Sequence, residues 1–206
     1  VANSNSRNLF SYIGYGVENQ EVTITGLNNL ETGLTTNMSS MFIGCKVSSL
    51  DVSSLNTENV NDMQNMFCNC SNLTSLDLNN FDTSKITTLF STFQGCSNLK
   101  ELKVSNWNTS NVVDMGEKAG YWGYGGTFMN CSKLTELDIS KWDTSNVIGM
   151  GQMFYGCSSL TNLDVSNFNT SNVISMYNMF NGCQNLTKLD VSNFDTSNVI
   201  GMNAMF

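Results

Sequence analysis

Apolar and polar residues follow a 26-residue pattern that recurs from residue 37 to the last residue and is clearest at residues 157–182. A fixed period of this length is typical of a repeat protein, in which each unit packs only against its neighbours. In the first half of the unit, Leu163, Asp164 and Val165 alternate apolar, polar, apolar, which is the period of a β-strand. The same step recurs at residues 50–52, 76–78, 102–104, 137–139 and 189–191.

The second half of the unit has apolar residues three or four positions apart, which is helical spacing. In residues 157–182 the Thr-Ser-Asn triplet at 170–172 supplies helix-capping residue types, and Gly182 is a suitable helix end. A second short strand over 170–173 is the alternative, and propensity leaves it open. The predicted fold class is an α/β repeat, a right-handed solenoid with one parallel sheet and short helices or 3₁₀ turns on the opposite side.

Two stretches depart from the period. Residues 1–36 are expected to form an N-terminal cap, in which residues 21–27 are a degenerate first repeat and the segment before them covers the end of the stack. Residues 37–206 are expected to form the solenoid, truncated within a repeat because residues 204–206 reach neither the Cys nor the Leu of the earlier units. The start of the chain is expected to be a mature or trimmed N-terminus.

The composition argues against several classes of function. The net charge of −8 and pI near 4.3 argue against nucleic-acid binding, which calls for a basic patch. No apolar run approaches the roughly 20 residues of a membrane span. The chain has no His, so the commonest general base and metal ligand is missing, and no other catalytic or phosphate-binding motif stands out. We therefore expect no enzyme, no cofactor and no metal site.

Six of the seven Cys residues share one repeat position: Cys45, Cys70, Cys96, Cys131, Cys157 and Cys183. Residues at one position of a stacked repeat lie in a column, and a column of thiols has no natural pairing. We expect these six to be buried free thiols, because free Cys behaves as a small hydrophobic residue. Cys68 occupies a position of mixed character and is expected nearer the surface.

The repeat unit resembles that of the BspA-type leucine-rich-repeat surface proteins of bacteria and some parasitic protists. Residues 186–194, LTKLDVSNF, followed by DTSNV, match that repeat nearly letter for letter, and the likeness extends over residues 37–206. The resemblance implies a leucine-rich-repeat solenoid displayed outside the cell, often within a longer anchored protein, with a role in adhesion or recognition. It brings no catalytic residues. The chain departs from the pattern at Lys103, where Asp is usual, near residues 45–47, and at an insertion within residues 116–126.

The Asp of each strand step is expected to point outward, so that Asp77, Asp138 and Asp164 form a column interrupted by Lys103. A column of like charges suggests a cation or a cationic ligand. The alternative, which we favour, is that each Asp is satisfied locally by Ser or backbone donors, since a hard cation needs several converging oxygen ligands. The recurrent Thr residues raise a similar choice between a regular lattice ligand and turn capping, and capping is favoured.

The insertion carries Tyr121, Trp122 and Tyr124 among four Gly residues, a composition typical of recognition loops. Two interpretations stay open: an exposed contact patch, or aromatic side chains that fold back and plug an irregular unit. Candidate ligand-binding residues are therefore Tyr121, Trp122, Tyr124, Lys103, Asp77, Asp138 and Asp164.

The resemblance implies an extracellular, cell-surface module, and together with the insertion it favours a recognition or adhesion function. Its expected partners are a host or matrix protein or a glycan, together with further repeats or domains of the same chain, and neither nucleic acid nor membrane insertion by this segment. The alternative is a structural spacer or self-associating solenoid of a larger surface protein.

Overall fold

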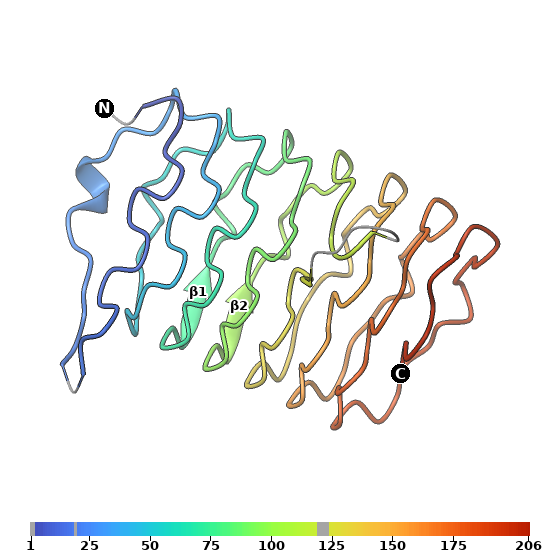
Figure 1. Ribbon diagram of the computed structural model, residues 1–206. Helices are drawn as coiled ribbons and strands as arrows, with labels where there is room; N and C mark the ends of the chain where they lie inside the picture. Colours follow the sequence, from blue (N-terminus) through green and yellow to red (C-terminus); the bar gives the residue numbers. More distant parts are fainter. Residues whose placement is uncertain (1–2, 19, 119–123) are drawn as a thin grey trace.

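The computed structural model describes residues 3–18, 20–118 and 124–206. Its repeats lie side by side as a stack of similar turns of the chain, each of which we call a rung (Figure 1). Parallel β-bridges join equivalent positions of successive rungs, in a column that runs from the N-terminal segment to the C-terminal one. The members of this bridge column are Asn5, Asn37, Asp62, Thr88, Asp114, Gly149, Ser175 and Gly201.

Regular secondary structure is sparse. In the described residues it comprises the 3₁₀ helix η1 (Leu27–Asn29) and the strands β1 (Ser75–Asp77) and β2 (Glu101–Lys103). The two strands pair in parallel, with Leu76 opposite Leu102 and Asp77 opposite Lys103. The other strand steps show the expected alternation of exposed and buried residues, as at residues 137–139 and 163–165, without forming strands. One strand per repeat is therefore realised in only two of the described repeats.

Short helices or 3₁₀ turns were the two forms expected in the second half of each repeat, and the described rungs have a run of turns there rather than α-helices. In residues 63–70, the N–H groups of Met66, Cys68 and Cys70 donate to carbonyls three residues back. The N–H groups of Asn65, Phe67 and Asn69 instead donate to backbone carbonyls of the next rung at 2.6–3.1 Å. Asn65 also has a left-handed φ of 57°, which a right-handed helix cannot contain. Backbone N–H groups that donate to the neighbouring rung cannot also form the hydrogen bonds within an α-helix.

A column of stacked aromatic rings fills the interior on this side. Neighbouring rings are nearly parallel, with centroids 5.3–6.0 Å apart. The column consists of Phe10, Phe42, Phe67, Phe93, Phe128, Phe154, Phe180 and Phe206. The Leu and Val residues of the strand steps and the Met residues of the turns belong to the same buried cluster. The core is thus one continuous column shared by all rungs.

The N-terminal segment joins this column earlier than the sequence suggested. Residues 5–13 pair with residues 37–46: the N–H groups of Ser6, Phe10 and Tyr12 donate to carbonyls of that rung at 2.7–2.9 Å. The Phe10 ring stacks on Phe42. These residues therefore take the place of a repeat's second half, whereas we had assigned the degenerate repeat to residues 21–27 and only a covering role to the segment before them.

The Cys column is tied to the rung before it. Each thiol lies within hydrogen-bond distance of the Phe carbonyl of the preceding rung, as Cys70 Sγ does with Phe42 O at 3.0 Å and Cys96 Sγ with Phe67 O at 3.1 Å. Burial raises the pKa of these thiols, that of Cys183 to about 11. The expectation for Cys68 was wrong: it is buried, and burial raises its pKa to about 11.

Candidate recognition surfaces

The outward side of the strand steps, here called the strand face, carries the predicted charged residues. Lys103 Nζ lies 3.2 Å from Asp77 Oδ2 and 3.5 Å from Glu101 Oε1. All three side chains are about half exposed, so solvent screens these ion pairs and their contribution to stability is small. Lys103 therefore neutralises the charge of its neighbour in the column and separates the acidic rungs on either side of it.

The Asp side chains of the strand face are satisfied locally. Oδ1 of Asp138 accepts hydrogen bonds from the hydroxyl and the N–H of Ser140 at 2.7 and 3.2 Å, and Oδ1 of Asp164 accepts the N–H of Ser166 at 2.9 Å. Hydrogen bonds from these Ser residues hold the pKa of both carboxyls below the usual range. In Asp77 the N–H of Asn79 is the main cause of a similar lowering. This matches the local alternative, and no group of three or more acidic or Cys residues in the described parts of the chain could hold a metal ion.

Two shallow grooves run across the strand face. Asp138 and Asp164 line one of about 850 Å³ together with Lys100, Glu101 and Asn162. Asp77 lines a second groove of about 700 Å³, with Asp51 and Ser53 among its walls. Both are open to solvent, so they suit an extended ligand better than a compact one.

The Thr column faces inward. Thr57, Thr83, Thr109, Thr144 and Thr170 are buried, and their hydroxyls lie within hydrogen-bond distance of carbonyls of the next rung at 2.9–3.1 Å. Buried hydroxyls with backbone partners cannot present a lattice to an external ligand. The Thr residues therefore tie rungs together.

The insertion leaves and rejoins its rung through paired backbone. Gly116 and Gly126 form an antiparallel bridge, and Glu117 forms another with Gly151 of the next rung. The N–H of Gly125 donates to Gln152 Oε1 at 3.0 Å. These contacts form a fixed stem, consisting of residues 115–118 and 124–127.

Close approach of backbones explains the Gly residues of the stem. A Cβ on Gly126 would lie 2.1 Å from the carbonyl oxygen of Gln152, and one on Gly116 would lie 2.1 Å from that of Gly151. A Cβ on Gly149 would also meet Gly116 O, at 2.8 Å. One sequence signal of this close approach was missed. The rung after the insertion has Gly-Met-Gly at 149–151, where the rung at 62–64 has Asp-Met-Gln.

The structure separates the predicted site residues into two places. Tyr124 is 76% exposed and continues into Gly125, whose Cβ position abuts the ring of Phe90 and the hydroxyl of Ser91. Both residues belong to the turn segment of an earlier rung, not to the strand face with Asp77, Lys103, Asp138 and Asp164. Exposure of Tyr124 is as expected for a contact patch, whereas Tyr121 and Trp122 lie outside the described residues.

The sequence was compared with models of known protein families. The family described as "Mycoplasma protein of unknown function, DUF285" matches residues 10–120 and 124–206. The chain belongs to the DUF285 family. The comparisons with curated proteins and with solved structures each found no match.

The limits of the DUF285 match follow the structure. The match begins at Phe10, the first ring of the aromatic column, and breaks at residues 121–123, within the insertion. Over the described residues, no helix has the length and apolar character that a membrane crossing would need.

Proposed function

We propose that this DUF285 chain is a non-enzymatic recognition module of the BspA-type leucine-rich-repeat class, displayed outside the cell, that binds a host or matrix protein or a glycan. The observation that carries the proposal is Tyr124, which is 76% exposed beside a stem locked by backbone pairing. An aromatic side chain offers a large contact area with few rotatable bonds, so little conformational entropy is lost on binding. Tyr is also among the residue types that dominate interface energetics.

Two features support the leucine-rich-repeat assignment. Leu76 and Leu102 are buried at paired positions of β1 and β2 and point to one side, as the leucines of such a repeat do. Successive rungs are also related by parallel bridges. Parallel connections are right-handed in nearly all proteins, so we propose a right-handed solenoid.

The alternative is a spacer or self-associating solenoid, and the strand face gives a specific reason to keep it. Its carboxylates already have local partners, for example Asp138 with Ser140 and Asp77 with Lys103. Groups that are satisfied within the chain add little affinity for a ligand. In a spacer, neither the insertion nor the strand face would contact a partner.

A binding screen against matrix proteins and a glycan panel, followed by titration of any ligand found, tests the proposal. Tyr124→Ala is expected to raise Kd by about 30-fold, which corresponds to the roughly 2 kcal/mol of a hot-spot residue. Tyr15→Ala is the matched control, because Tyr15 is 74% exposed but lies near the N-terminal end of the stack. Binding that responds equally to both variants, or no binding to any member of the screen, would refute the proposal and favour the spacer.

A further inference from the structure

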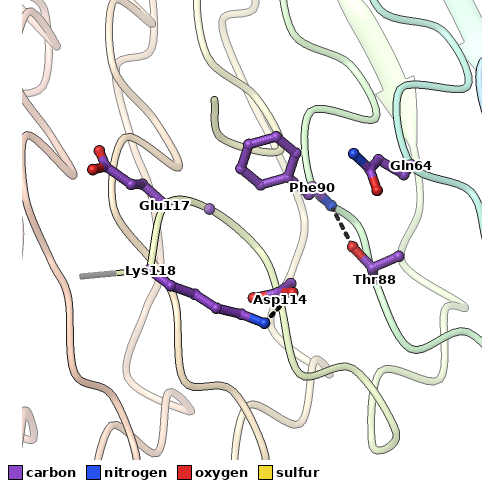
Figure 2. A pocket seen from close by; sticks show the side chains of 7 residues that line it. Gln64, Thr88, Phe90, Asp114, Glu117 and Lys118 are labelled. Carbon is purple, nitrogen blue, oxygen red and sulfur yellow. Dashed lines mark hydrogen bonds and ion pairs between the residues drawn. The ribbon is translucent and has the colours of Figure 1, made fainter. Parts of the chain in front are cut away.

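A small pocket lies where the stem of the insertion meets the earlier rungs. It has a volume of about 240 Å³ and is lined by Gln64, Thr88, Phe90, Asp114, Gly116, Glu117 and Lys118. Figure 2 shows the Phe90 ring, the Gln64 amide and the Asp114–Lys118 pair arranged around one space, while the Glu117 carboxylate turns away from it. The pocket is on the turn segments, apart from the grooves of the strand face.

The pocket lies where one rung departs from the side-chain hydrogen bonding of the bridge column. In the column, the side-chain oxygen of Asn37, Asp62 or Thr88 accepts the N–H two residues further on, at 2.9–3.2 Å. At Asp114 the chain turns into the stem at Gly116, and Asp114 Oδ1 has no hydrogen-bond partner among the described residues. The departure leaves an acceptor at the pocket wall without a donor, a condition that is costly inside a protein.

The charges at the wall disfavour a charged ligand of either sign. Asp114 Oδ2 is paired with Lys118 Nζ, and the two side chains are only 21% and 30% exposed. The ammonium of Lys118 would repel a cation, and the carboxylate of Asp114 would repel an anion. Burial raises the pKa of the Glu117 carboxyl, and this carboxylate turns away from the pocket (Figure 2). A neutral ligand avoids both penalties.

The remaining wall groups define what a neutral ligand must offer. Phe90 is half buried and presents an aromatic ring, which favours an apolar C–H surface. Thr88 Oγ1 accepts the N–H of Phe90 at 3.2 Å, so its O–H stays available as a donor. The Gln64 amide, which makes no hydrogen bond with other described residues, offers a donor and an acceptor.

We propose that this pocket binds one neutral pyranose ring, either free or as a terminal unit of a glycan. A pyranose has hydroxyl donors around its rim and an apolar C–H face, which match the Asp114 carboxylate and the Phe90 ring. Asp114 lines the pocket, and its Oδ1 is an acceptor without a partner among the described residues. The volume of about 240 Å³ is below the roughly 300–1,000 Å³ typical of drug-sized ligands, as a site for a single ring requires.

Ligand-observed NMR on the whole chain with D-glucose, D-galactose, D-mannose and N-acetyl-D-glucosamine provides the test. At least one of these sugars is expected to bind with a Kd of roughly 1–10 mM, the affinity range of a ligand with so few atoms. D-glucosamine and D-glucuronic acid, which carry a positive and a negative charge on a similar ring, are expected to bind at least about tenfold more weakly.

Two variants locate the binding. Phe90→Leu keeps an apolar side chain but removes the ring. Gln64→Ala removes an amide that has no hydrogen bond with the described residues. Each is expected to raise Kd by about tenfold. Tyr177→Leu is the control, because Tyr177 occupies the position of Phe90 on a later rung and is not part of the pocket wall.

Three outcomes would overturn the inference: no binding of any neutral sugar at tens of millimolar, tighter binding of D-glucosamine or D-glucuronic acid, or binding unchanged by both Phe90→Leu and Gln64→Ala. The inference extends the proposed recognition function and rests on it only in taking a glycan as one ligand class. A sugar that binds in the pocket while Tyr124→Ala has no effect would sink the proposed role of Tyr124 alone. If Tyr124→Ala weakens ligand binding but no sugar binds in the pocket, only the inference about the pocket is refuted.

Discussion

The aromatic column makes a quantitative prediction about where along the stack a Phe matters. Phe93 has no exposed surface and is flanked by Phe67 at 5.7 Å and Phe128 at 5.6 Å, with Trp107 tilted against it at 5.9 Å. Phe93→Ala removes a ring that contacts rungs on both sides and leaves a cavity too enclosed to collapse fully. We expect a large loss of stability from this one substitution.

The expected size follows from these contacts. Replacing a buried Phe by Ala costs about 3–5 kcal/mol, which includes the cavity, and each aromatic pair contributes about 0.5–1.5 kcal/mol beyond burial. With three aromatic neighbours, Phe93 belongs in the upper half of this range, at about 4 kcal/mol. For a chain of this length that corresponds to a fall in Tm of roughly 8–16 °C.

Phe206→Ala is the matched control, since Phe206 occupies the same position in the repeat but is 71% exposed and stacks on Phe180 alone, at 6.0 Å. We expect it to cost less than about 1 kcal/mol. Both variants are compared with the wild type by urea unfolding, monitored by circular dichroism. Equal losses for the two variants, or a loss below about 1.5 kcal/mol for Phe93→Ala, would contradict the view that the column stabilises the stack.

Two further predictions concern the surface carboxyls and the stem. Hydrogen bonds from Ser or backbone donors lower the folded-state pKa of Asp138 and Asp164, so the stability that they contribute is present above the unfolded value of 3.8 and is lost as the pH falls through the folded-state pKa. The urea midpoint should therefore fall between about pH 5 and pH 3, and less steeply in the Asp138→Asn variant; an unchanged slope would count against the local hydrogen bonds. Gly149→Ala should destabilise the chain by about 1–3 kcal/mol, because its Cβ would lie 2.8 Å from Gly116 O. At Gly201, in the same column, the nearest atom is 3.6 Å away, so Gly201→Ala should be tolerated, and equal effects on the urea midpoint would refute the close approach.

The period, the buried positions and the inward Leu and Val residues could be predicted from the sequence because they follow from apolar spacing alone. The spacing of three or four residues in the turn segments left helices and 3₁₀ turns open, because Met and Phe residues in a run of turns can be spaced as in a helix. What distinguishes the two is the left-handed residue within each run, such as Ser40 or Gln152, and neither type is a reliable marker of a positive φ. The alternative partner for the backbone N–H groups, a neighbouring rung, lies about 25 residues away and is invisible to local pattern.

The N-terminal rung shows another limit. Residues 5–13 have the turn geometry of a repeat: Asn8 and Tyr12 have the left-handed φ that Ser40 and Gly44 have one rung later. Leu9, Phe10 and Ile13 keep apolar positions of the repeat, but Ser6 stands where the next rung has Met38, and the strand step of a full unit does not precede them. Pairing geometry, rather than composition, defines it as a rung.

The candidate site was only partly within reach of the sequence. The exposed Tyr124 followed from its place outside the repeat pattern, whereas the pocket depends on residues from three rungs that no local motif joins: Gln64, Phe90 and Asp114. Each of these residues has a counterpart at the same repeat position in other rungs, so the sequence pattern does not mark any of them as part of a pocket. They meet only because the period brings positions about 26 residues apart side by side.

Repetition and recognition therefore place different demands on the same chain. A rung that follows the pattern has its side-chain acceptors satisfied, as Asp62 Oδ1 is by the N–H of Gln64 at 2.9 Å, and so has little to offer a ligand. Where the stem interrupts the pattern, Asp114 loses that partner and gains Lys118, and a concave space opens beside Phe90. The regular rungs on both sides hold these groups in position through the bridge column. A site can thus arise in a repeat protein from one interruption, provided that the neighbouring rungs keep the register that the interruption breaks.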